Sequence, residues 1–134
     1  MMRFLLLLLG SALLTACQGC GQGLELATVQ GVVQYNGTPL TGGNVIFSPV
    51  DHHSKADGQI KSDGTYALKT IKRAGSAPGS YRVTIVTDLE IRGKEVRIIC
   101  QSPKKYLLKV EAEKENQFVI NISQTEGWKQ SIDD

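Results

Sequence analysis

Few side chains in this sequence could do chemistry, and their spacing limits what they can do. Asp51, His52 and His53 form the one cluster of metal-ligand types, and Asp57 lies nearby. Neighbouring residues on a strand point to opposite faces, so such a cluster binds one ion only from a loop. A closed transition-metal site needs three or four converging ligands. We therefore expect a solvated loop here, and we predict no metal site and no cofactor.

Cys17 ends a segment with the features of a secretory signal. Met1-Met2-Arg3 gives a positive start, and Phe4 to Ala16 is apolar. As a helix this stretch would reach roughly 20 Å, which is short of the bilayer's hydrocarbon core of about 30 Å. Leu14-Thr15-Ala16-Cys17 resembles the lipobox of bacterial lipoproteins. That resemblance implies a signal peptide over residues 1–16, removed in the mature chain, and lipidation of Cys17.

The lipobox also implies a location and a first partner. The lipid on Cys17 would anchor the chain in a membrane of the cell envelope. Gln18 in place of Asp favours the outer membrane, with the domain facing the periplasm or the exterior. Without residues 1–16, 14 basic side chains face 13 acidic ones, so we expect no nucleic-acid partner. We expect a monomer whose further partner is an envelope protein or a glycan.

The remaining sequence divides into a tether, one domain and a tail. Residues 17–27 are rich in glycine, which is typical of a flexible tether. Apolar residues alternate with polar ones in several short segments between residues 28 and 123, and turn residues separate these segments. This pattern predicts an all-β sandwich or barrel of about seven strands. Residues 124–134 are expected to be a polar tail, and Asp88–Ile99 is either a strand or an inserted loop.

Four motifs in order give the domain a family resemblance. They are Gly31–Leu40 followed by Gly43–Phe47, Asp63-Gly64-Thr65-Tyr66, Pro78–Val83, and Pro103–Val110. The first three resemble carboxypeptidase regulatory-like domains, and the last resembles an ending found in planctomycete-type lipoproteins. The resemblance implies a single transthyretin-like (prealbumin-like) β-sandwich. It also implies a non-catalytic interaction or structural module at the cell envelope.

An enzyme is a less favoured interpretation. Some transthyretin-fold proteins are 5-hydroxyisourate hydrolases, which have widely separated His and Arg residues and a C-terminal Tyr-Arg-Gly-Ser. Here the two histidines are adjacent, and the chain ends in Gln130–Asp134. No Ser-His-Asp arrangement, phosphate-binding loop or pair of catalytic carboxylates stands out. We predict that the protein is not an enzyme and has no catalytic residues.

Binding of a small ligand, with carbohydrate as the first candidate, is the alternative function. Related sandwiches bind sugars through exposed aromatic side chains. Five of the seven mature aromatic residues are in phase with the predicted core, namely Tyr35, Phe47, Tyr66, Tyr81 and Phe118. Tyr106 and Trp128 remain to form a platform, although a lid on the core is the favoured interpretation of Trp128.

Cys20 and Cys100 remain after lipidation of Cys17. An extracytoplasmic location permits a disulfide bond between them. Such a bond needs Cα atoms within about 7 Å. The alternative is that Cys100 is an apolar filler in phase with Ile98. We predict that both thiols stay free.

Overall fold

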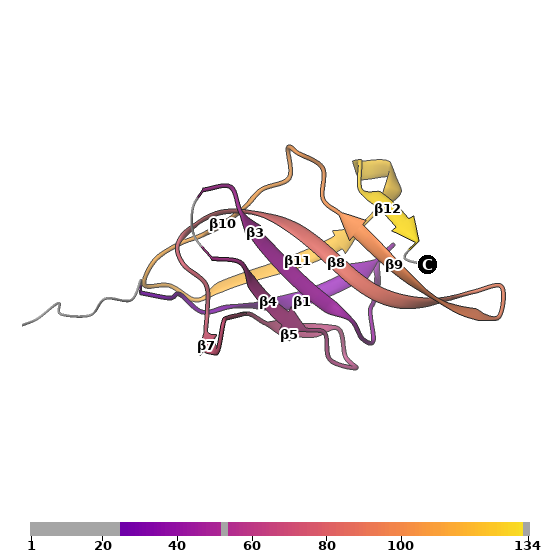
Figure 1. The fold of residues 1–134 in the computed structure, drawn as a ribbon, viewed down its shortest axis with the longest axis horizontal. Coiled ribbons are helices and arrows are strands. Elements are labelled where there is room, and N and C mark those ends of the chain that lie inside the picture. The colour runs from indigo at the N-terminus through magenta and orange to yellow at the C-terminus, as the bar shows by residue number, and fades with distance from the viewer. Residues whose placement is uncertain (1–24, 52–53, 133–134) are drawn as a thin grey trace, which may run out of the picture.

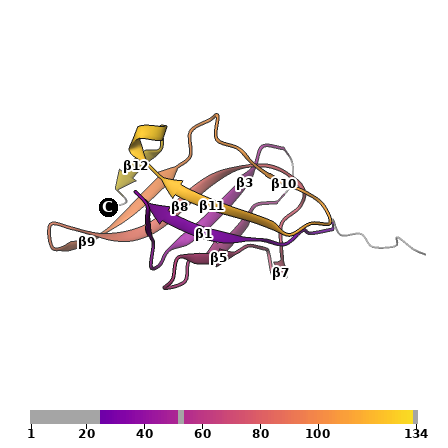
Figure 2. The ribbon, with the colours of Figure 1, turned by 180° about the vertical axis from the view of Figure 1, so that it is seen from behind.

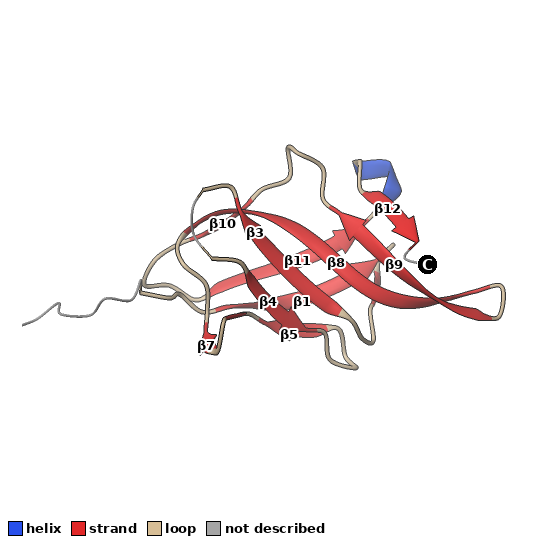
Figure 3. Ribbon diagram, in the orientation of Figure 1, coloured by secondary structure: helices blue, strands red, loops and turns tan. Residues whose placement is uncertain are grey.

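The computed structural model describes residues 25–51 and 54–132, which form an almost entirely β domain (Figures 1 and 3). The strands, in chain order, are β1 (Val29–Tyr35), β2 (Thr38–Pro39), β3 (Asn44–Pro49), β4 (Ala56–Gln59), β5 (Thr65–Ala67), β6 (Lys69–Thr70), β7 (Arg73–Ala74), β8 (Gly79–Ile91), β9 (Lys94–Gln101), β10 (Leu108–Val110), β11 (Asn116–Ile122) and β12 (Lys129–Ile132). One 3-10 turn, Gln124–Glu126, precedes β12. The all-β prediction is confirmed.

The smaller sheet has four strands, in which β1 lies between β11 on one side and β2 and β5 on the other. β1 and β11 run parallel and side by side, as Figure 2 shows. Asn36 and Gly37 join β1 to β2 with φ angles of 50° and 85°. Positive φ at both central positions is the conformation that a two-residue hairpin needs, so the Asn-Gly turn forms as expected.

The larger sheet has the order β12-β9-β8-β3-β4-β6-β7, and β10 pairs with the start of β8. Its longest pairing joins β8 to β9 through a hairpin. Asp88–Ile99 therefore forms the tip and arms of this hairpin, which answers the question that the sequence left open. Arg92 and Gly93 make the turn, both with positive φ.

One hydrophobic core receives side chains from both sheets. Alternate residues of the long strands point into it, so buried and exposed side chains alternate in the same way as apolar and polar residues do in the sequence. The largest fully buried side chains include Tyr66, Tyr81, Phe47, Leu68, Ile85, Ile120 and Ile122. The Phe47 ring lies at the centre, with ring centroids of Tyr66, Tyr81 and Phe118 at 6.5, 5.7 and 6.2 Å. Tyr35 and Phe118, expected in the core, are only half-buried.

Two expectations from the sequence need correction. The segment expected to be a polar tail is part of the fold, because β12 pairs with β9. Trp128 is buried and the Gln130 amide donates to the Tyr35 hydroxyl at 2.8 Å, so two further contacts hold this segment. The strand number also exceeds seven, because β2, β6 and β7 are two-residue pairings too short to show alternation.

Within the described residues, no helix is long and apolar enough to span a membrane.

Candidate functional site

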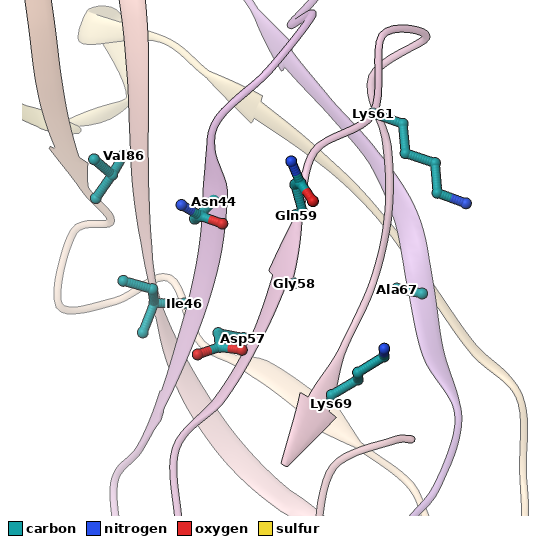
Figure 4. Close-up of a pocket in the computed structure, with 9 residues that line it drawn as sticks. All are labelled: Asn44, Ile46, Asp57, Gly58, Gln59, Lys61, Ala67, Lys69 and Val86. Carbon is teal, nitrogen blue, oxygen red and sulfur yellow. The ribbon is translucent and has the colours of Figure 1, made fainter. Parts of the chain in front are cut away.

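A shallow hollow of about 670 Å³ lies on the outer face of the larger sheet. Its lining comes from β3, β4, the end of β5 and β6, together with Lys61 after β4 and Val86 of β8 (Figure 4). The nine lining residues are Asn44, Ile46, Asp57, Gly58, Gln59, Lys61, Ala67, Lys69 and Val86. It is larger than the hollow of about 380 Å³ between the β1–β2 hairpin and β8.

The register of the strands places the polar side chains of the hollow on one face. Asn44 on β3 is opposite Gln59 on β4, and Asp57 on β4 is opposite Lys69 on β6. Val45, between two of these outward positions, is fully buried. Because side chains alternate across a strand, burial of Val45 directs Asn44 and Ile46 outward.

Gly58 forms the floor of the hollow and lets two strands approach each other closely. A Cβ atom at this position would lie 2.3 Å from the backbone oxygen of Ala67, which is far inside van der Waals contact. Any larger residue would push β4 away from the β5–β6 segment. Gly58 therefore sets the width of the hollow between Asp57 and Lys69.

The polar side chains around the hollow are exposed to solvent. Among residues 25–51 and 54–132, no hydrogen bond or ion pair occupies the side chains of Asn44, Asp57, Gln59, Lys61 or Lys69. Figure 4 shows the Asp57 carboxylate and the Lys69 ammonium on either side of Gly58, with the two amides above them.

This arrangement offers donors and acceptors together. Each amide can both donate and accept, the carboxylate only accepts, and the ammonium only donates. Half-buried Ile46 and Val86 add an apolar strip beside them. The set suits a neutral polar ligand, or a polar segment of another molecule, whose groups both donate and accept hydrogen bonds.

The residues singled out from the sequence lie elsewhere or outside the described part. Cys17, His52 and His53 fall outside the described residues. Within the described ranges, no group of three His, Cys, Asp or Glu side chains could hold a metal ion. Asp57 borders the hollow, whereas Asp51 lies in a loop after β3.

Trp128 is a lid on the core and not half of a platform. Its side chain is 5% exposed, and its ring centroid lies 5.4 Å from that of half-buried Tyr106. The indole Nε1 is buried without a hydrogen-bond partner. Because Trp128 is buried, the two rings do not form an exposed platform, and only Tyr106 keeps part of its ring exposed.

Cys100 is free and buried, with its side chain in the core beneath β8 and β9. This agrees with the prediction of an apolar filler. Burial raises the pKa of the thiol to about 11. Its possible partner in a disulfide bond, Cys20, lies outside the described residues.

The residues of the hollow were not predicted from the sequence. Asn44, Asp57 and Gln59 alternate with apolar or small residues, which was a signal that they face outward. Their convergence depends on the register of β3 against β4 and on the close approach at Gly58. Neither feature can be found from alternation in a single sequence.

No family model matches the chain, and no curated protein matches it. Among solved structures, its fold is similar to that of a "putative carbohydrate binding protein" from Pseudomonas aeruginosa. The two share 9% sequence identity with a TM-score of 0.48, over 77% of this chain and 92% of that chain. A similarity this distant carries no argument about function, so the residues of this chain must carry it.

Proposed function

We propose that this chain is a lipid-anchored, non-catalytic binding module of the bacterial cell envelope. The observation that carries the proposal is the hollow over β3, β4 and β6. Exposed side chains of Asn44, Asp57, Gln59 and Lys69 lie together there, and none of the four has a hydrogen bond or an ion pair within residues 25–51 and 54–132. Exposed groups that already face one another across a hollow need little reorganisation to bind a ligand. The domain supplies a rigid two-sheet support for this surface.

The fold type proposed is the transthyretin-like β-sandwich. Three motifs that carry the resemblance fall on structural features of the domain. Gly31–Leu40 covers β1, the Asn-Gly turn and β2, and Asp63-Gly64 makes the turn before β5. Pro78-Gly79 leads into β8, where Tyr81 is buried. The parallel pairing of β1 with β11 supports a two-sheet fold in which distant segments meet.

The anchor proposed is the lipid on Cys17. The described domain begins at Glu25, eight residues after Cys17, and an extended chain of that length reaches at most about 29 Å. The module would therefore stay near the bilayer surface, at the outer membrane if Gln18 directs sorting. Cys17→Ser should abolish palmitate labelling and leave an unprocessed precursor. Equal labelling of the variant and the wild type would contradict the anchor.

A non-catalytic role is supported by the composition of the hollow. Its polar lining is two amides, one carboxylate and two lysines, with no Ser, Cys, His or Tyr to serve as nucleophile beside a base. Asp57 and Lys69 are both exposed to solvent. The arrangement therefore resembles a binding surface more than a reaction centre.

The binding proposal is tested with the full chain and two matched double variants. Asp57→Ala/Gln59→Ala removes two polar side chains from the hollow. Glu90→Ala/Glu95→Ala removes two exposed carboxylates from the tip of the β8–β9 hairpin. Retention of components from a solubilised envelope should fall for the first variant only. Equal retention by all three proteins would refute the role of the hollow.

Carbohydrate is the second candidate for the ligand, and the mixed donors and acceptors favour it. A sugar hydroxyl donates to a carboxylate and accepts from an amide or an ammonium group, and the hollow offers all three. Aromatic stacking is absent from its lining. We therefore expect weak binding, which titration calorimetry with soluble envelope glycans would detect. No heat change at high glycan concentration would exclude this candidate while leaving a protein partner open.

A further inference from the structure

One edge of the smaller sheet is open. The N–H of Asn116 donates to the Thr28 carbonyl and the Ile122 carbonyl accepts from Asn36, so the even-numbered residues of β11 bond toward β1. Peptide groups of successive strand residues point to opposite sides. The N–H and C=O groups of Gln117, Val119 and Asn121 therefore point away from β1. No other described strand pairs with β11.

The other edges of the two sheets are protected in ways that β11 is not. The larger sheet ends in β7, of two residues including Arg73, and in β12, of four residues including Lys129. Its third edge strand, β10, has three residues including Lys109. In the smaller sheet, β2 has two residues including Pro39, and β5 has three. Short strands, charges and proline are the usual protection against edge pairing. β11 has seven residues, Asn-Gln-Phe-Val-Ile-Asn-Ile, with no charge, proline or glycine.

We infer that β11 pairs with β11 of a second copy of this chain, antiparallel about a two-fold axis through Val119. In this register Val119 lies opposite Val119 of the second copy, and Gln117 lies opposite Asn121. By symmetry Asn121 also lies opposite Gln117 of the second copy, which gives three pairs. Each pair exchanges two N–H···O=C bonds, so every outward peptide group of the three residues is satisfied. The two four-stranded sheets become one continuous sheet.

The side chains of β11 are self-complementary in this register. Val119 is 66% exposed and lies beside Val32 of β1, so the pairing joins two valine rows into one. Amides meet amides on either side of this row, since Gln117 faces Asn121. On the inner face, half-buried Phe118 faces Ile120 of the second copy and gains cover. No like charges are opposed anywhere along the strand.

The identity of the partner follows from this symmetry. An isologous contact needs one patch that complements itself, and a strand with apolar centre and amide flanks does so. The side chains of β1 next to β11 on the outer face, Gln30, Val32 and Gln34, are also uncharged. Pairing at this edge therefore takes no charged side chain of either strand out of water. The inference departs from the monomer expected from the sequence.

A cysteine cross-link in the full chain tests the pairing and its register. In a Cys20→Ser background, Val119→Cys should form a disulfide-linked dimer under mild oxidation, because hydrogen-bonded antiparallel pairs have Cα atoms about 5.5 Å apart. Peptide mapping should show that the bond joins the two introduced cysteines. Gln117→Cys should not link to itself, because its two copies would be separated by about 14 Å.

Ile71→Cys is the matched control for accessibility. Ile71 is 83% exposed on the β6–β7 turn, away from β11. Dimer at residue 119 but not at 71 or 117 supports the proposal. Equal cross-linking at 71 and 119, or a product of 119 joined to a different protein, overturns it.

Val119→Lys provides a second measurement that does not depend on cross-linking. This change places two ammonium groups face to face across the axis while leaving an exposed position of the monomer otherwise intact. Native mass spectrometry of the detergent-solubilised full chain should give a dimer for the wild type and for Val119→Ile. The mass should be halved for Val119→Lys. A wild-type protein that is monomeric at every concentration, or a dimer that Val119→Lys leaves unchanged, refutes the pairing.

Discussion

The outer faces of the two sheets differ in chemistry. The larger sheet exposes charges, including Asp57 and Lys69 at the hollow and an Asp88–Arg97 ion pair at 3.2 Å on β8 and β9. The smaller sheet exposes amides and valines in matched rows, such as Val32 beside Val119. Removing a charged group from water costs more free energy than removing an uncharged polar or apolar group. The first face therefore suits a small polar ligand, and the second suits contact with another protein surface.

The largest expected loss of stability comes from truncating Phe47, whose ring lies in the core between the two sheets. Phe47 is fully buried, and its ring packs against three other aromatic rings. Phe47→Ala should lower the free energy of unfolding by about 3–5 kcal/mol, because it removes buried area and leaves a cavity. Chemical denaturation measures this loss. Val50→Ala, at an exposed position away from β11, is the control and should change stability by less than about 0.5 kcal/mol. A Phe47→Ala loss below about 1 kcal/mol would show that the core is assigned wrongly.

The next effect should fall on the smaller sheet alone. Asn116 is buried at the start of β11, and its Nδ2 donates to the carbonyls of Thr28, Glu111 and Lys114. Its Oδ1 accepts from the Glu111 N–H at 2.9 Å. Asn116→Ala leaves buried backbone groups without these partners and should cost about 2–4 kcal/mol.

Glu115→Ala is the neighbouring control for this experiment, because Glu115 is exposed and lies before β11. Denaturant unfolding followed by circular dichroism compares the two variants. Equal stability of Asn116→Ala and Glu115→Ala would mean that the side chain of Asn116 does not hold β11 to β1 and to the turn before it.

A smaller effect should be confined to the hollow on the larger sheet. Gly58→Ala places a methyl group against the Ala67 carbonyl, so β4 must move away, at a cost of about 1–3 kcal/mol. Ligand retention should fall in parallel, because the hollow changes width. Gly42→Ala is the control, since a Cβ there meets nothing within 4 Å. Unchanged stability and ligand retention in Gly58→Ala would show that the hollow does not depend on the close approach of β4 to β5.

Both faces were partly predictable, for different physical reasons. Alternation between Val29 and Ile122 predicted the all-β fold, and Asn36-Gly37 predicted a turn, because both signals are local. The course of the chain after Ser123 was missed, since Lys129–Ile132 has no alternation and its place depends on pairing with β9. The hollow was missed because it arises from register and from one close backbone approach. The open edge of β11 is likewise a property of the neighbours of the strand and not of its residues alone.

The smallest expected effect concerns Cys100, in the core beneath the charged face. Burial raises the pKa of its thiol from an ordinary 9.0 to about 11. The fold therefore favours the protonated thiol, and this contribution to stability is fully present below about pH 9 and is lost as the pH rises through about 11. The free energy of unfolding should fall more between these pH values in the wild type than in Cys100→Ala. Equal losses would show that the thiol is not buried. Alkylation gives an independent check: Cys100 should be protected in the folded protein and react after unfolding without reductant, together with Cys20. A Cys20–Cys100 linked peptide would contradict the free thiols and would tie the segment before Glu25 to the core of the larger sheet.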